Sequence, residues 1–246
     1  MRETQALIER VRKISPEWQH LELAIEPELT HIQPGQTLLA RLGASFEPYI
    51  REQWIPLGFN PDDGVLIVER PLSRHYIAGD AVQLLGPVGS PFSLSRNIKN
   101  LLLVAMDYPP TRLLSLMLQA IAEGMSVVLV LTGKAQEYPL STLPSAVEIV
   151  RSAAVQSWET QQQTISWAEQ VFVVASPVYA EIYYRELLKV ATEIRRALPQ
   201  SFLHGIYALP LPCGTGACMG CMVRRKGSDQ LVCLQGPAFD LSKMPF

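Results

Sequence analysis

Charged side chains are scarce in this sequence, and neither sign of charge dominates. Asp, Glu, Lys and Arg make up 18% of the 246 residues, against about a quarter in a typical soluble domain. The formal net charge is −2, so the chain lacks the basic excess that binds nucleic acid or an anionic membrane. Hydrophobic residues make up 48%, which is typical of a globular chain. We therefore expect no nucleic-acid partner and predict that another protein covers part of the surface.

Long apolar runs are also missing. The most apolar region, residues 113–131, is interrupted by Gln119, Glu123 and Gly124, so it lacks the ~20 consecutive apolar residues that a membrane span needs. Residues 1–18 carry several charges and no apolar run, which argues against a secretion signal. We therefore expect a cytoplasmic protein without a membrane span. The sequence has no nucleophile elbow, Walker loop or HExxH motif, so nothing supports hydrolase or kinase chemistry.

Strand, turn and helix signals divide the chain into three parts of a multidomain α+β fold. Residues 1–98 contain short strand-like segments separated by turn residues, which predict a small antiparallel β-barrel: 36–42, 65–69 and 81–85. Residues 99–200 alternate apolar runs with helical patterns, which predicts a parallel α/β sheet and a helix over residues 177–198. Residues 201–246 form a separate cysteine segment. The polar stretch 151–169 fits either a loop or a short helix.

All four cysteines lie near the C-terminus, after 212 residues that contain none. Cys213, Cys218, Cys221 and Cys233 are spaced C-x4-C-x2-C-x11-C, and the first two gaps match plant-type [2Fe-2S] spacing. The glycines between them let the backbone approach inorganic sulfides and direct N–H groups at them. Residues 222–233 predict a hairpin that returns Cys233 to the loop. We predict that these four thiolates hold a [2Fe-2S] cluster.

A structural zinc site, two disulfides or a group of unliganded cysteines are the alternatives. Zinc sites of this kind usually pair two C-x2-C knuckles, and a single knuckle occurs here. Disulfides are rare in the cytoplasm. The spacing therefore favours the cluster over zinc and over disulfides.

Two further motifs accompany the cysteines. CGTGACMGC at residues 213–221 is followed by VC and by GPAFD up to Asp240, and GPVGSPF occupies residues 86–92. With them, the chain resembles the electron-transfer subunit of two-component dihydroorotate dehydrogenases, a branch of the ferredoxin-reductase superfamily. A barrel, an α/β sheet and a cysteine segment follow one another in that family too. The resemblance implies FAD in the barrel, NAD(H) at the first strand-to-helix turn of the sheet, and a cluster that passes electrons to a separate catalytic subunit.

Two features of the family's nicotinamide site are absent. The corresponding turn, residues 106–111, has no glycine, contains two prolines that lack N–H donors, and places Asp107 where an anion would bind. After the third strand the family has Cys-Gly-Pro, where this chain has Ala175, Ser176 and Pro177. We therefore expect direct hydride uptake from NAD(H) to be impaired or absent.

The resemblance also implies residues that border a flavin: Arg51, Arg70, Ser73, Gly86 and Gly89. The RPLS stretch that begins at Arg70 is similar to the family's RPxS motif but lies close to Gly86, whereas Arg51 lies nearer the expected position without the Pro-x-Ser continuation. Arginine and serine side chains in these places would bind phosphate. The other interpretation, surface residues of an edge strand and a turn, stays open.

These observations predict an oxidoreductase component rather than a stand-alone enzyme. It would relay electrons between FAD and a partner oxidoreductase in a hetero-oligomer. The resemblance implies a dihydroorotate dehydrogenase-like partner and a role in pyrimidine biosynthesis. One alternative is a cluster-bearing adaptor that lacks FAD and NAD. Another is a zinc-stabilised interaction module without a redox role.

Overall fold

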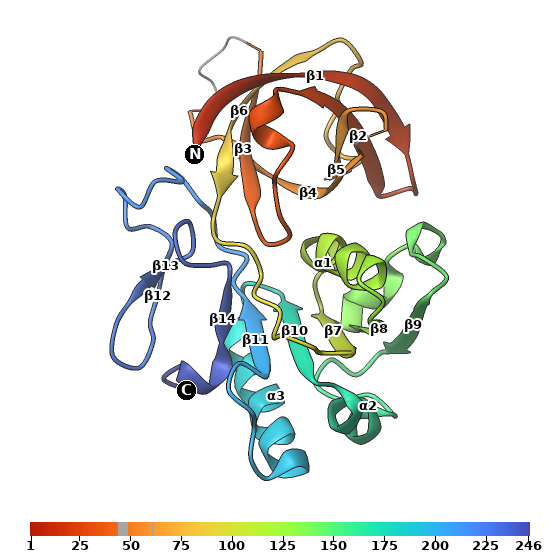
Figure 1. Cartoon of the computed structure of the whole chain (residues 1–246), viewed down its shortest axis with the longest axis vertical. Coiled ribbons are helices and arrows are strands. Elements are labelled where there is room, and N and C mark those ends of the chain that lie inside the picture. Colours follow the sequence, from red (N-terminus) through yellow and green to blue (C-terminus); the bar gives the residue numbers. More distant parts are fainter. Residues whose placement is uncertain (44–48, 61) are drawn as a thin grey trace.

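The N-terminal part of the chain closes into a barrel, as the sequence predicts. The computed structural model describes residues 1–43, 49–60 and 62–246. The barrel has the strand order β1-β2-β5-β4-β3-β6, with every neighbouring pair antiparallel and β6 pairing back to β1 (Figure 1). Its strands are β1 (Arg2–Lys13), β2 (Trp18–Ile25), β3 (Thr37–Leu42), β4 (Glu52–Asn60), β5 (Val65–Pro71) and β6 (Ala81–Val88).

Alternating burial explains why these segments form a barrel. Along β2 and β6 every second side chain faces inward, which is the pattern of a sheet with one face on the core. The interior is filled by Ile8, Leu23, Leu38 and Trp54, each at most 1% exposed, so the barrel is packed rather than hollow. A short 3-10 helix, η1 (Pro27–Leu29), lies in the connection between β2 and β3.

The second part is a mostly parallel sheet with helices on both faces. Its order is β14-β11-β10-β7-β8-β9, and β14 is antiparallel to its neighbour β11. The strands are β7 (Asn100–Met106), β8 (Ser126–Thr132), β9 (Val147–Ser152), β10 (Gln170–Ala175), β11 (Leu203–Ile206) and β14 (Ala238–Asp240). Every residue of β10 is buried, because helices cover both sides, and this is why the strand reads as a continuous apolar run.

Helix α1 (Thr111–Ala122) packs on one face of this sheet, against Leu101, Leu103 and Ala105. Helices α2 (Gln161–Trp167) and α3 (Ala180–Arg195) cover the other face. Short 3-10 helices follow β8: η2 (Gly133–Glu137) and η3 (Leu140–Thr142). The stretch that the sequence left open thus contains α2.

The helix predicted over residues 177–198 is shorter at both ends. Pro177 and the two residues after it form a turn in which the Tyr179 N–H donates to the Ser176 carbonyl at 2.9 Å, and α3 begins at Ala180. The helix ends at Arg195 because the next residue, Arg196, has a φ of 60°, outside the helical region.

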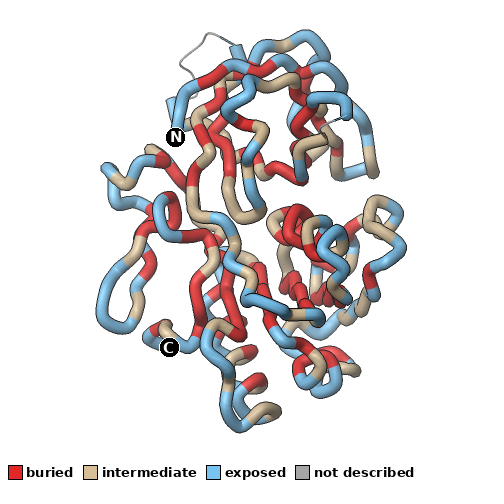
Figure 2. The backbone as a smooth tube through the Cα atoms, viewed as in Figure 1, coloured by how far each residue is buried: buried red, intermediate tan, exposed pale blue. Residues whose placement is uncertain are grey.

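The cysteine segment lies beside both preceding parts (Figure 1). It contains the predicted hairpin, formed by β12 (Met222–Val223) and β13 (Gln230–Leu231), and ends in η4 (Leu241–Lys243). In Figure 2, stretches of buried residues continue from the sheet into this segment. Cys221 and Cys233 share an apolar core with Leu39 and Val88 of the barrel. Among the described residues, no helix is long and apolar enough to cross a membrane.

Candidate iron-sulfur site and the barrel crevice

The four cysteines come from one loop and one hairpin. Cys221 immediately precedes β12, and Cys233 follows β13, so hairpin pairing brings them together. The Cys233 N–H donates to the Cys221 sulfur at 3.5 Å. Both residues are buried, whereas Cys218 is exposed and Cys213 is intermediate. The structure therefore brings two of the predicted ligands, Cys221 and Cys233, together in buried positions and leaves Cys218 at the surface.

Backbone N–H groups point at the sulfurs of the loop cysteines. The Thr215 N–H lies 3.4 Å from the Cys213 sulfur, and the Gly220 N–H lies 3.5 Å from the Cys218 sulfur. Hydrogen bonds from Thr215 and Cys218 lower the pKa of Cys213 to about 6. Burial, together with the neighbouring Cys221 and Cys213, raises the pKa of Cys233 to about 12. N–H donors of this kind stabilise negative charge on thiolate ligands.

The loop also needs a glycine where it meets the barrel. Gly214 has a φ of +68°, and a Cβ there would lie 2.7 Å from the Leu39 side chain of β3. A larger residue here would be strained by the positive φ and would displace the Leu39 side chain. Among residues 1–43, 49–60 and 62–246, no group of three or more His, Cys, Asp or Glu is arranged to hold a single metal ion. Four thiols with N–H donors fit the ligand chemistry of a [2Fe-2S] cluster.

The GPVGSPF stretch contacts the cysteine segment directly. The Gly89 N–H donates to the Cys233 carbonyl at 3.1 Å, and the Ser90 N–H donates to the Gly236 carbonyl at 2.6 Å. The Ser90 hydroxyl donates to the Leu234 carbonyl at 2.8 Å. The sequence analysis assigned Gly89 to a flavin and did not single out Ser90, although Ser90 lies in the same motif. Gly86 is required by packing, since a Cβ there would lie 2.5 Å from the Leu38 side chain.

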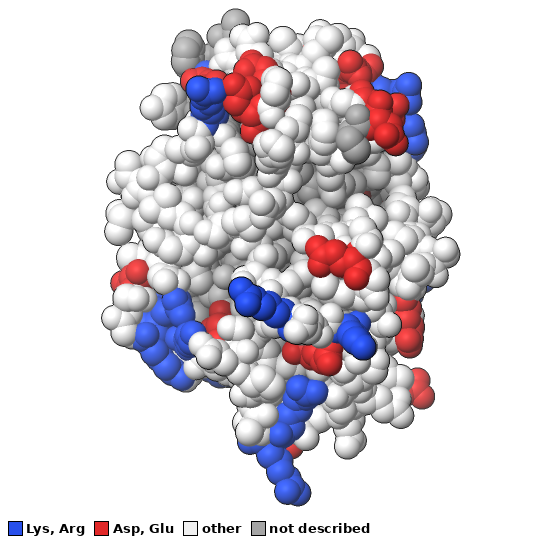
Figure 3. All heavy atoms as spheres, viewed as in Figure 1, with Lys and Arg blue, Asp and Glu red and all other residues white. Residues whose placement is uncertain are grey.

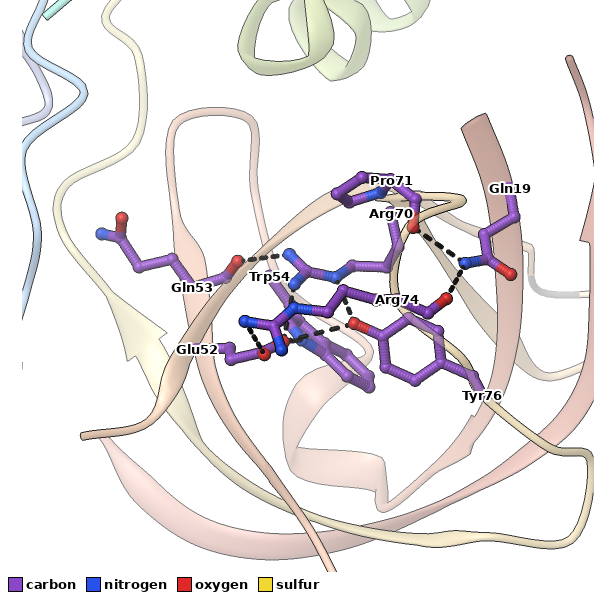
Figure 4. Close-up of polar contacts among 8 residues, drawn as sticks. All are labelled: Gln19, Glu52, Gln53, Trp54, Arg70, Pro71, Arg74 and Tyr76. Carbon is purple, nitrogen blue, oxygen red and sulfur yellow. Dashed lines mark hydrogen bonds and ion pairs between the residues drawn. The ribbon is translucent and has the colours of Figure 1, made fainter. Parts of the chain in front are cut away.

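The two arginines implied for a flavin are paired within the chain. Arg51 forms an ion pair with Glu3 of β1. Arg70 donates from Nη2 to Glu52 at 2.7 Å, from Nη1 to the Gln53 carbonyl at 2.7 Å, and from Nε to the Tyr76 hydroxyl at 2.9 Å (Figure 4). Every nitrogen of the Arg70 guanidinium therefore has a partner inside the barrel. Ser73 lies exposed in the turn after β5.

Glu52 holds a second cation as well. Its carboxylate lies 3.3 Å from the Arg74 guanidinium, and it accepts a hydrogen bond from the Tyr76 hydroxyl at 3.2 Å (Figure 4). Burial of Tyr76 raises its pKa, partly offset by the charge of Arg70. The ion pair between Glu52 and Arg70 was not predicted from the sequence, because the two residues lie on different strands and no local spacing links them.

A buried carboxyl group joins the barrel to helix α1. Glu69 of β5 is 2% exposed and accepts hydrogen bonds from the Thr111 and Tyr138 hydroxyls, both at 2.5 Å. His20 Nε2 lies 3.4 Å from the same carboxyl group. Burial and the neighbouring Glu69 raise the pKa of Tyr138, so its hydroxyl stays protonated and donates. Thr111 is the first residue of α1, where the family's nucleotide phosphates would approach.

The turn before α1 is also occupied by the chain's own groups. Asp107 has a φ of 54°, and its side chain accepts the Lys134 N–H at 3.2 Å. Pro110 precedes the helix without a capping side chain. A carboxylate and two prolines leave this turn with few donors for a phosphate.

A hollow of about 290 Å³ lies between the barrel and the sheet's helix α1, lined by Leu57 and Phe59 of β4 and by Ser115 and Leu118 of α1. A second cavity, between Ile55 and Arg112, measures only about 10 Å³. A groove of about 820 Å³ lies between the start of α3, β12 and the C-terminal residues. None of the five residues implied for the flavin lines the groove or the hollow. Because the two arginines among the five are paired with carboxylates of the chain, these residues do not form a site for FAD in this arrangement.

The fold is that of ferredoxin reductases. The NADH-dependent reduced ferredoxin-NADP oxidoreductase has a TM-score of 0.72 and 17% identity, and the match covers 97% of this chain and 88% of that chain. Phthalate dioxygenase reductase has a TM-score of 0.57 and 15% identity, covering 92% and 75%. A ferredoxin NADP+ reductase from Neisseria gonorrhoeae has a TM-score of 0.56 and 14% identity, covering 76% and 90%.

The cysteine segment identifies a more particular relationship. Residues 211–244 match the iron-sulfur cluster binding domain of dihydroorotate dehydrogenase B. No curated protein matches the chain by sequence. The chain therefore has a ferredoxin reductase-like fold, and its residues 211–244 match a dihydroorotate dehydrogenase B-type iron-sulfur binding domain, as the resemblance predicted.

Proposed function

We propose that the chain is an electron-transfer subunit that holds a [2Fe-2S] cluster on Cys213, Cys218, Cys221 and Cys233. The observation that carries the proposal is the cysteine segment itself. It matches an iron-sulfur binding domain, contains four cysteines and directs backbone N–H groups at the sulfurs of Cys213, Cys218 and Cys221. When bound, the cluster accepts and releases one electron at a time.

The surrounding residues bury one side of the site and leave the other side exposed to solvent. Cys221 and Cys233 are 1% and 3% exposed, which keeps water from their sulfurs. Residues 217–220 are all exposed, so a partner protein can approach the Cys218 side of the cluster. Thr215 and Gly220 hold their N–H groups against the sulfurs and stabilise the added negative charge. The electron would therefore leave through the exposed loop.

The partner is a catalytic oxidoreductase subunit in a hetero-oligomer. The family match supports a dihydroorotate dehydrogenase-like partner, and with it a role in pyrimidine biosynthesis. Figure 3 shows a face with few charges, with Lys and Arg gathered over the β12–β13 hairpin, whose loop holds Arg224, Arg225 and Lys226. A sparsely charged surface supports a protein partner. Four free thiols support a reducing, cytoplasmic location.

The test is an anaerobic visible spectrum of the purified chain, with iron, acid-labile sulfide and zinc measured on the same sample. We expect iron and sulfide in the ratio of a [2Fe-2S] cluster and an absorbance that bleaches on reduction. A Cys218→Ser variant should lose most of that absorbance, whereas Ser228→Ala in the exposed hairpin loop should keep it. Zinc without sulfide would support the zinc-stabilised module and overturn the proposal.

A second candidate is the adaptor that carries a cluster without FAD or NAD. The pairing of Arg51 with Glu3 and of Arg70 with Glu52 favours it over the flavoprotein. Flavin content, measured after incubation with FAD, distinguishes the two.

A further inference from the structure

Carboxyl groups of this chain occupy the places where a bound dinucleotide would need cations or N–H donors. Glu3 pairs with Arg51, Glu52 pairs with Arg70 and Arg74, and Glu69 accepts from Thr111 at the start of α1. A phosphate is recognised by the same groups that bind a carboxylate. Each of these intramolecular carboxyl groups therefore competes directly with a phosphate.

Arg70 shows how complete this competition is. Its side chain is 12% exposed, and its guanidinium lies against the rings of Trp54 and Tyr76, with centroids 5.5 and 5.9 Å away. Figure 4 shows Glu52 and the Gln53 carbonyl at the guanidinium end of Arg70, where both accept hydrogen bonds from it. A phosphate could bind Arg70 only by displacing Glu52, a charged partner that belongs to the same chain and lies on the neighbouring strand β4.

A carboxyl group of the chain also occupies the donors at the start of helix α1. The side chain of Glu69 is fully buried and takes both the Thr111 and the Tyr138 hydroxyl. Arg112, the next residue of α1, donates to the Gln53 side chain at 3.3 Å across the crevice. Phe92, in the connection between β6 and β7, packs on Phe172 of β10, with ring centroids 5.3 Å apart. The Glu69 and Arg112 contacts join the barrel to α1.

We infer that Glu3, Glu52 and Glu69 replace the dinucleotides in this chain, which therefore binds neither FAD nor NAD(H) and exchanges electrons one at a time through its cluster. The redox part of this inference rests on the proposed function. The group that reduces the cluster must then supply single electrons. In this protein that group is a reduced redox centre of a partner protein. In a model reaction, methyl viologen radical cation loses one electron to become the dication, and the oxidised cluster gains it without hydride transfer.

The first experiment measures flavin binding to the purified, cluster-containing chain. FAD fluorescence anisotropy should stay at the value of free FAD up to about 100 µM protein, and acid extracts should contain no flavin. Bound FAD in either measurement overturns the inference and leaves the proposed function standing. Iron and sulfide are quantified on the same sample, so a missing cluster overturns the proposed function while the flavin result is still read independently.

The second experiment tests the role of Glu52 with inorganic pyrophosphate as the probe. Glu52→Gln keeps a hydrogen-bond acceptor for Tyr76 but removes the charge that holds Arg70 and Arg74. We expect it to bind pyrophosphate at least about tenfold more tightly than the wild type by calorimetry. Glu9→Gln, an exposed site on β1 with the same charge change, should not. Equal binding by all three proteins overturns the assignment of Glu52.

The third experiment tests the electron donor. NADH should leave the visible absorbance of the cluster unchanged, and reduced methyl viologen should bleach it under the same anaerobic conditions. Bleaching by NADH alone overturns the inference. Matching circular dichroism spectra of wild type and variants ensure that each comparison concerns folded protein.

Discussion

His204 is a buried histidine whose neighbours define its protonation. It lies on β11, is 8% exposed, and stacks on Phe172 with ring centroids 4.8 Å apart. Asp240 stands opposite it in the β11–β14 register, and Lys243 follows in η4. Burial lowers the pKa of His204, Asp240 opposes this by favouring the imidazolium, and Lys243 adds to the lowering. The histidine is therefore neutral in the folded chain at neutral pH.

This burial predicts a pH-dependent stability. Because the pKa of His204 is lower in the folded state than the ~6.5 of an unfolded chain, the unfolded chain binds the proton first as pH falls. The free energy of unfolding should hold above about pH 6.5, decrease as pH falls below it, and level off below the folded pKa. His204→Phe, which keeps the stack on Phe172, should lessen this decrease in urea titrations between pH 7.5 and 5. Parallel pH profiles for the two proteins would contradict the assignment.

At the scale of elements, helix α1 is attached to strand β5 by a single carboxyl group. Thr111→Val keeps the shape of the side chain but removes one of the two hydroxyl donors to Glu69. Since the Glu69 carboxyl group is buried, the free energy of unfolding should fall by roughly 1.5–3 kcal/mol in urea denaturation. Thr30→Val removes an exposed hydroxyl that donates to the Pro27 carbonyl at 2.8 Å. This control should change stability by less than about 0.5 kcal/mol, and an equal effect of both would show that Glu69 does not join the elements.

The segment after β6 depends on one glycine for a different reason. Gly89 has a φ of +87°, and a Cβ there would lie 3.0 Å from the Gly236 carbonyl. Gly79 has a similar φ of +98° but no atom within 4 Å of its Cβ position. Gly89→Ala should therefore destabilise the chain more than Gly79→Ala, by roughly 1 kcal/mol or more, and should speed the loss of cluster absorbance in chelator. Equal effects would mean that backbone strain alone matters at Gly89.

Local sequence patterns predicted secondary-structure elements, but they did not predict the side-chain contacts between those elements. The apolar run around Leu129 and the knuckle at Cys218 and Cys221 specify a buried strand and thiol ligands without reference to the rest of the chain. By contrast, Arg70 was assigned to a flavin phosphate or to an exposed edge, because nothing in the sequence shows that Glu52 lies beside it. Glu69 and Thr111 are 42 positions apart, and no periodicity in the sequence links them. Side-chain pairing across strands and between domains depends on the closed fold, so the flavin interpretation could not be decided from the sequence.

At the scale of the whole molecule, the barrel and the sheet behave as one unit rather than as hinged domains. Inter-domain contacts within a chain are usually polar and permit motion unless they are extensive. Here a buried carboxyl group joins the barrel to α1, and Gly89 and Ser90 join it to the cysteine segment. These two connections involve different elements, β5 with α1 and the β6 extension with residues 233–236, and Arg112 of α1 also contacts Gln53 of β4. Separating the barrel from the sheet therefore requires breaking both connections as well as the Arg112 contact.

We expect the wild type to unfold in one transition, with cluster absorbance and far-UV circular dichroism changing at the same urea concentration. Combining Thr111→Val with Gly89→Ala weakens both connections, and the two signals should then separate, with the cluster lost first because the barrel supports Cys233 through Gly89. Each single variant should keep coincident transitions, since one connection remains intact. Two transitions in the wild type, or coincident ones in the double variant, would show that the domains are joined by other contacts.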